Sequence, residues 1–199
     1  MQRLLTYEDA AVEGCWREVA ADILVIPFWK PDFCRELIAA AEILDEFQPY
    51  EPDVTNNAAP GQELRINRIS PRFAEHFEAH FQRRIAPVLK THWWPLQLGK
   101  VRMPFVLRYS PDTQPALTPH HDAALVSLAM PLNKGYEGGA LIFPRQHWDS
   151  SEVETGHVIA FPSGVTHVHG TTPVTAGTRY AMTAWIAAPR DDPHDPIIA

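Results

Sequence analysis

The chain has 199 residues, with 17 Lys and Arg against 24 Asp and Glu and a formal net charge of −7. Its hydrophobic share of 45% is typical of a globular domain and excludes a disordered or collagen-like chain. The acidic balance excludes a broad nucleic-acid-binding surface, and no apolar run is long enough to span a membrane.

The first half of the chain predicts one strand and two helices. Residues 23–28 form a short apolar run rich in β-branched side chains, which is typical of a strand. Apolar residues recur at spacings of three and four over 33–44 and again over 73–89, which indicates two amphipathic helices. Between them, 50–61 has turn-forming residues and no periodicity, and we expect a loop there.

After Gly99 the pattern changes to short β-prone runs separated by turn chemistry. The expected strands cover 105–109, 124–130, 140–143, 157–161 and 180–186. Such spacing predicts a mainly β fold with flanking α, a double-stranded β-helix (jelly-roll, cupin-like) barrel preceded by two or more helices. We expect one domain, with a helical support region over about 20–98, a jelly-roll core over about 99–188 and a tail over 189–199.

Candidate chemistry concentrates in the strand half. His120 and Asp122 are two residues apart, so on a strand both side chains leave the same face. The segment Thr166-His167-Val168-His169 offers two candidates, His167 and His169, for a third ligand of matching parity. Two imidazoles and one carboxylate on one face of a metal form the facial triad of non-haem Fe(II) oxygenases.

Two other histidine patterns are weaker candidates. His147 and Asp149 repeat the spacing, but they lie in an expected loop close to the far histidines, with little sheet between the ligands. His76 and His80 lie four apart on the second expected helix, and no third ligand is near them. We therefore expect His147 and Asp149 to be a chance match and His76 and His80 to lie on a solvated helix face.

Arg179 starts the last expected strand, ten residues after His169. By itself it reads as a surface residue at a strand start. A guanidinium that points into a barrel needs an anion, and no acidic residue lies in that stretch. A guanidinium fork matches a carboxylate, so a dicarboxylate that chelates iron, such as 2-oxoglutarate, is the simplest partner for Arg179.

Several motifs together resemble the catalytic domain of the procollagen lysyl hydroxylases. The matching segments are 105–115, 119–123, 132–133, 136–139, 166–169 and 177–180, and a weaker resemblance extends over residues 22–187. This resemblance implies a dioxygenase that binds iron through His120, Asp122 and His169, with His167 lining the pocket. It also implies that Arg179 binds the 2-oxoglutarate carboxylate, with Tyr109 and Asn133 as further co-substrate contacts.

The resemblance further implies a set of cofactors and partners. They are Fe(II), 2-oxoglutarate and O2, with ascorbate as a candidate reductant. The expected reaction is hydroxylation of an amino acid (lysine as the first guess), a peptide or a biosynthetic intermediate. We expect neither nucleic acid nor a membrane as a partner. The oligomeric state stays open, a homodimer included. With two cysteines in no disulfide framework, we expect a cytoplasmic location.

Two alternatives stay open at this point. A metal-dependent hydrolase or isomerase on a cupin-like barrel would use the same two histidines and aspartate with zinc or manganese. A non-catalytic jelly-roll module would only bind a ligand. Arg179 discriminates against the hydrolase, which has no need of a cation at that spacing, and intact metal ligands argue against the binding module.

Overall fold

The computed structural model describes residues 11, 14–49 and 62–189. The loop expected over 50–61 and nearly all of the tail expected over 189–199 lie outside the described residues. Among the described residues, no helix is both long and apolar enough to cross a membrane.

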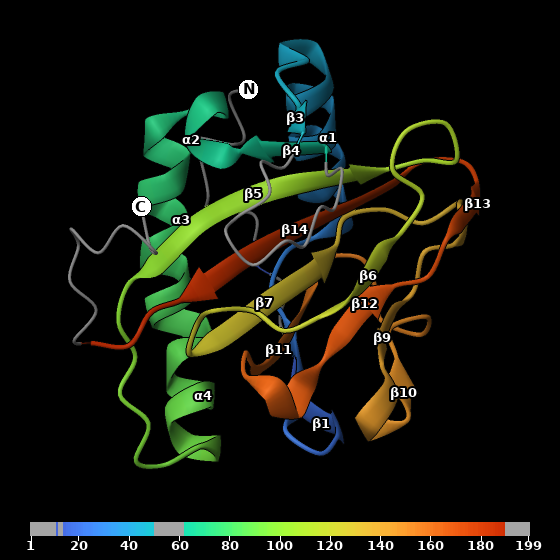
Figure 1. The fold of residues 1–199 in the computed structure, drawn as a ribbon. Coiled ribbons are helices and arrows are strands. Elements are labelled where there is room, and N and C mark those ends of the chain that lie inside the picture. The colour runs from blue at the N-terminus through green and yellow to red at the C-terminus, as the bar shows by residue number, and fades with distance from the viewer. Residues whose placement is uncertain (1–10, 12–13, 50–61, 190–199) are drawn as a thin grey trace.

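Two sheets face each other (Figure 1). The large sheet has eight strands in the order β1 (Arg17–Ala20), β2 (Ile23–Pro27), β11 (His157–Pro162), β7 (Val126–Pro131), β14 (Arg179–Ile186), β5 (Val101–Tyr109), β4 (Gln62–Arg65) and β3 (Gln48–Pro49). The small sheet has the order β10 (Trp148–Asp149), β9 (Leu141–Phe143), β12 (His169–Thr171) and β6 (Leu117–His120). A separate ribbon pairs β13 (Val174–Ala176) with β8 (Glu137–Gly138).

Helices cover the outer face of the large sheet. They are α1 (Pro31–Leu44), α2 (Ile66–Ile69), α3 (Pro71–Arg84) and α4 (Ala86–His92). Figure 1 shows α3 and α4 on one side of the large sheet and strands β9 and β12 on the other. The single helix expected over 73–89 is split at Ile85, because Pro87 has no N–H to donate to the carbonyl of Arg83.

Alternation along the strands divides the side chains between two cores. Leu64, Val106 and Met182 point outward into the core that the helices cover. Phe143 and Phe161 point inward, into a smaller core between the two sheets. Each strand of the large sheet therefore has one face against the helices and one face that looks into the barrel. The expected fold class, a mainly β jelly roll with flanking helices, is confirmed.

The first half of the chain differs from the sequence-based expectations in further ways. The first half of the chain contributes four strands to the large sheet, and of these only β2 was expected. The expectation of a solvated face was wrong for His80, which is 2% exposed and packs on Phe28 at 4.6 Å between ring centroids. The apolar stripe of α3 is wide enough to include this imidazole. Burial, together with the positive charges of the nearby Arg84 and Arg83, lowers the pKa of His80 to about 4.

Candidate metal centre and anion site

The small sheet brings the predicted metal ligands together. Strands β6 and β12 are antiparallel, and their register places His120 directly opposite His169. Asp122 follows β6 by two residues, and its backbone N–H donates to the carbonyl of Ser163 at 3.0 Å. His120 Nε2 lies 3.4 Å from Asp122 Oδ1, and His169 Nε2 lies 3.5 Å from Asp122 Oδ2. The three candidate ligand atoms all lie within 4.8 Å of one another.

Backbone carbonyls set the orientation of both imidazoles. His120 Nδ1 donates to the carbonyl of Thr118 at 2.9 Å, and His169 Nδ1 donates to the carbonyl of His167 at 2.9 Å. With the proton held on Nδ1, each ring presents its Nε2 lone pair to the space shared with Asp122. This is the arrangement in which histidines ligate metals, because the hydrogen bond on the other nitrogen selects the tautomer.

The Asp122 and His169 side chains have protonation states that suit a bound cation. Burial lowers the pKa of His169 and so favours the neutral ring that a metal needs. Burial alone would raise the pKa of Asp122, but hydrogen bonds from His120 and Ser127 and the charge of His169 hold it below its usual value. Burial opposes protonation of His120, but the Asp122 carboxylate and the Thr118 carbonyl raise its pKa. A metal cation would take the place of the proton that the Asp122 carboxylate attracts to His120 Nε2.

The sequence analysis missed two serines, of which Ser127 holds the Asp122 carboxylate and Ser163 bonds to Ser127. Ser127 on β7 donates from Oγ to Asp122 Oδ2 at 2.5 Å, and its Oγ also lies 2.8 Å from Ser163 Oγ. Both serines are buried, at 1% and 0% exposure. The only sequence signal is a polar residue inside the apolar run of β7, and that signal does not identify the partner.

Arg179 and Tyr109 form a second part of the site, opposite the small sheet. They are direct partners in the pairing of β14 with β5, and the Arg179 guanidinium lies 5.0 Å from the centroid of the Tyr109 ring. Burial raises the pKa of Tyr109, although the Arg179 charge and hydrogen bonds to Thr171 and Arg179 oppose it. Thr171 lies on β12, two residues after His169, so this pair packs against the strand that carries a metal ligand.

The surroundings of Arg179 suit an anion. The side chain is 5% exposed, and no carboxylate of the described residues forms a salt bridge with it. Gly139 leaves room for it, because a Cβ at this position, where φ is +67°, would lie 2.9 Å from Arg179 Cδ. A buried guanidinium is unfavourable without a negative partner, so this environment fits a bound carboxylate.

Asn133 supports Arg179 through the backbone. Its Nδ2 donates to the carbonyl of Thr178 at 2.8 Å, and its Oδ1 accepts from the N–H of Tyr180 at 2.8 Å. These two residues flank Arg179, so Asn133 fixes the turn into β14. The predicted contact between Asn133 and the co-substrate stays a prediction, and the geometry assigns Asn133 a positioning role.

The weaker histidine candidates lie elsewhere. His147 is exposed in the left-handed region at φ +50°, and Asp149 accepts a hydrogen bond from the N–H of Ser151, so the structure gathers no metal cluster there among its described residues. The expectation that His167 lines the pocket was wrong. His167 is buried against Phe161, and its Nε2 lies 3.1 Å from the carbonyl of Ala21.

A second group with metal-ligand chemistry consists of Glu18, Asp22 and His92. Its carboxylates are largely exposed, and hydrogen bonds already engage them. Asp22 Oδ1 accepts from the Trp93 indole at 2.7 Å, and Glu18 Oε1 accepts from the N–H of Asp22 at 2.9 Å. These contacts join the turn between β1 and β2 to the end of α4, which is a structural role.

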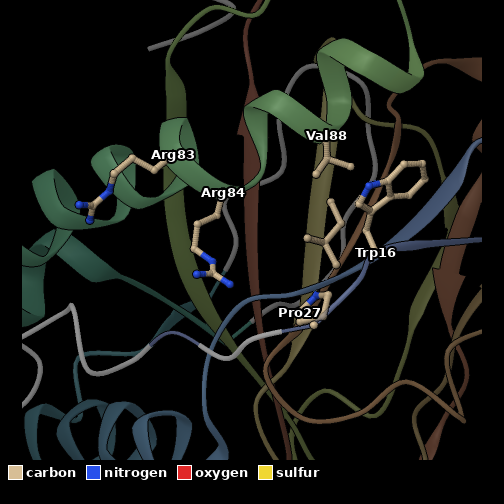
Figure 2. Close-up of a pocket in the computed structure, with 7 residues that line it drawn as sticks. Trp16, Pro27, Arg83, Arg84 and Val88 are labelled. Atoms are coloured by element: carbon tan, nitrogen blue, oxygen red, sulfur yellow. The ribbon is translucent and has the colours of Figure 1, made fainter.

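A groove of about 230 Å³ lies on the other side of the large sheet from the metal centre. Figure 2 shows Arg84 and Val88, from the helices α3 and α4, facing Trp16 and Pro27. Ile26, which also lines the groove, points into the helix-covered core rather than into the barrel. The groove is therefore separate from the triad and from Arg179.

The donor set limits the chemistry of the site. Two neutral imidazoles and one carboxylate leave coordination positions open, which is the pattern of non-haem Fe(II) oxygenases. A buried cation faces the same space from the opposite wall, where a dicarboxylate would be held at its far end. The residues present thus fit an Fe(II) ion chelated by 2-oxoglutarate.

Comparisons with known proteins agree with this geometry. Residues 104–187 match the model of the 2OG-Fe(II) oxygenase superfamily. A Caenorhabditis elegans multifunctional procollagen lysine hydroxylase and glycosyltransferase is 31% identical over 190 residues, which cover 85% of this chain and 24% of that protein. Gallus gallus procollagen-lysine,2-oxoglutarate 5-dioxygenase 1 is 39% identical over 188 residues, or 89% of this chain and 25% of that protein. The chain thus spans about a quarter of the length of these curated relatives.

Solved structures show the same fold. A Pseudomonas putida prolyl-4-hydroxylase covers 93% of this chain and 98% of its own, with a TM-score of 0.61 and 20% identity. A Trichoplax adhaerens prolyl hydroxylase in complex with a hypoxia-inducible factor peptide covers 84% of both chains, with a TM-score of 0.63 and 14% identity. Residues 104–187 thus match the 2OG-Fe(II) oxygenase superfamily, and the solved prolyl hydroxylases share the fold of the chain.

Proposed function

We propose that this chain is an Fe(II)- and 2-oxoglutarate-dependent hydroxylase of an amino-acid side chain, either free or within a peptide. The observation that carries the proposal is the buried Arg179, which has no carboxylate partner in the described part of the chain and faces the barrel that holds the triad. A hydrolase or isomerase would use the same metal ligands but would have no role for this cation. The relatives named as lysine hydroxylases support an amino-acid side chain as the target.

Each residue of the site has a separate task in this proposal. His120, Asp122 and His169 would hold Fe(II), and the hydrogen bond from Ser127 fixes the Asp122 carboxylate. Arg179 would bind the carboxylate of 2-oxoglutarate that is remote from the metal. The ion supplies the redox chemistry that couples decarboxylation of 2-oxoglutarate to oxidation of a C–H bond.

The protein contributes orientation and exclusion of water. Tyr109 is 1% exposed and lies beside the Arg179 guanidinium, so bulk water is kept from the ion pair that Arg179 would form. A charge-assisted hydrogen bond is stronger in such a site than in water. The core between the sheets, with Phe143 and Phe161 against the His169 ring, fixes the imidazole in place.

The direct test is Fe(II)-dependent release of succinate from 2-oxoglutarate. Purified protein is screened with free amino acids and short peptides, and mass spectrometry detects the gain of one oxygen. His120→Ala and Asp122→Ala should abolish succinate release, whereas His147→Ala, at the chance match, should leave it unchanged. Activity that survives both ligand variants would contradict the assignment.

We also propose a cytoplasmic location, which the cysteines support. Cys15 is exposed and Cys34 is buried, and both are free thiols. Burial raises the pKa of Cys34 to about 12, so this thiol is protonated and unreactive at neutral pH. Cell fractionation with an antibody against the chain tests this proposal, and recovery outside the cytoplasm would contradict it.

A further inference from the structure

Glu63 lies on the face of the large sheet that looks into the barrel. Strand β4 pairs with β5 in a register that places Glu63 opposite Leu107. Its neighbour Leu64 points into the helix-covered core, so alternation turns Glu63 to the inner face. Tyr109 shares this inner face and is the diagonal neighbour of Glu63, at about 7–8 Å for such a pair. Glu63 therefore lies beside the site that Tyr109 and Arg179 form.

The Glu63 carboxylate forms no salt bridge with any residue that the structure describes. It is half-buried, and within the described ranges it has no hydrogen-bond or salt-bridge partner. Burial raises its pKa, and the charge of Arg65, two residues further on the same face, lowers it. Arg65 is exposed and forms no salt bridge with Glu63. A partly desolvated carboxylate is unfavourable without a positive partner, so a cation that enters the barrel would be stabilised there.

An apolar surface connects Glu63 with the metal centre. Phe105 is on the inner face of β5, and its ring centroid lies 5.2 Å from that of Trp185 on β14. Trp185 is the direct strand partner of Ser127, whose hydroxyl holds the Asp122 carboxylate. The indole Nε1 of Trp185 is buried and has no hydrogen-bond partner among the described residues. This wall suits an aliphatic chain that runs from the metal toward Glu63.

We propose that Glu63 binds the positively charged end group, an ammonium or a guanidinium, of the side chain that the enzyme hydroxylates. This inference rests on the proposed function and adds to it the charge of the substrate and the residue that recognises it. The aliphatic part of the substrate lies along Leu107 and Phe105, and its C–H bonds face the metal centre. A free amino acid and a residue within a peptide carry the same cationic end group. The test below distinguishes these two kinds of substrate.

The test is anaerobic calorimetry on the protein loaded with Fe(II) and 2-oxoglutarate. The probes are lysine and its neutral isostere 2-aminoheptanoic acid, each as the free amino acid and as the Nα-acetyl methylamide, and arginine with its neutral isostere citrulline. We expect at least one cationic probe to bind about tenfold or more tightly than its isostere, as for a hydrogen bond to a charged group. Tighter binding of the free form indicates a free amino acid as the substrate, and tighter binding of the capped form indicates a residue within a peptide.

Variants assign the preference to Glu63. Glu63→Gln should reduce the ratio of the two affinities at least about tenfold, while the affinity for 2-oxoglutarate stays the same. Glu63→Asp keeps the charge and should retain the preference for the cation, and Glu152→Gln, on an exposed turn, is the matched control. Circular dichroism and thermal melting establish that each variant is folded.

The outcomes separate this inference from the proposed function. Equal binding of cationic and neutral probes to the wild-type protein, or an unchanged preference in folded Glu63→Gln, overturns the role of Glu63. Neither result affects Fe(II)-dependent binding of 2-oxoglutarate. Conversely, failure to bind 2-oxoglutarate contradicts the proposed function, and the same probes can still be titrated into the protein without it.

Discussion

Replacing Ser127 by alanine removes the only hydroxyl that donates directly to the Asp122 carboxylate among the described residues. Ser127 is 1% exposed, so water cannot readily take its place. A hydrogen bond to a charged group contributes about 1.5–3 kcal/mol, which corresponds to a factor of roughly 10 to 100 in affinity. Residues that orient metal ligands typically contribute the same 10- to 100-fold.

We therefore expect Ser127→Ala to weaken Fe(II) binding about 10- to 100-fold, as measured by anaerobic competition with a chelator of known affinity. The matched control is Ser151→Ala, because the Ser151 hydroxyl bonds to the Asp149 carboxylate at the exposed chance match. This control should bind Fe(II) as the wild-type chain does. An affinity of folded Ser127→Ala within twofold of the wild type would refute the orienting role of Ser127.

Three further predictions concern other parts of the molecule. Because the folded pKa of His80 is about 4 and the unfolded value about 6.5, its contribution to stability is present above pH 6.5 and is lost as the pH falls toward 4. When the pH falls from 7 to 5, the free energy of unfolding in urea should decrease by about 2 kcal/mol more for the wild type than for His80→Leu. Equal decreases in the two proteins would contradict the assignment. Gly139→Ala should raise the KM for 2-oxoglutarate, since its Cβ would lie 2.9 Å from Arg179 Cδ; an unchanged KM would show that Arg179 tolerates the contact. His147→Ala should leave the affinity for Fe(II) unchanged in the same chelator assay. A reduced affinity would instead indicate that His147 and Asp149 bind the metal.

Alternation and residue parity predicted much of the fold and the metal centre. The runs that became β5, β7, β9, β11 and β14 were visible because each buries at least one apolar face. His120 and Asp122 were found because metal-binding side chains two residues apart leave the same face of a strand, and because several strands fit between them and His169. The choice of His169 over His167 came from a family resemblance, and the register of β6 with β12 places His169 opposite His120.

The features that escaped prediction depend on long-range contacts. Strand β4 has the sequence Gln-Glu-Leu-Arg, which lacks the apolar alternation of a strand because Leu64 is its only apolar residue. Ser127 and Ser163 lie 36 residues apart and meet only when β7 and the turn after β11 come together. The burial of His80 depends on Phe28, a residue from another part of the chain. No local pattern encodes these pairs.

The most direct test of the account is an anaerobic absorption titration with Fe(II) and 2-oxoglutarate. If Fe(II) sits on His120, Asp122 and His169 and is chelated by 2-oxoglutarate, a weak metal-to-ligand charge-transfer band should appear in the visible spectrum. Folded Arg179→Gln should show the same band only at a much higher concentration of 2-oxoglutarate, because the carboxylate loses its charged partner. No band in the wild-type protein, or equal titration curves for wild type and Arg179→Gln, would contradict the account.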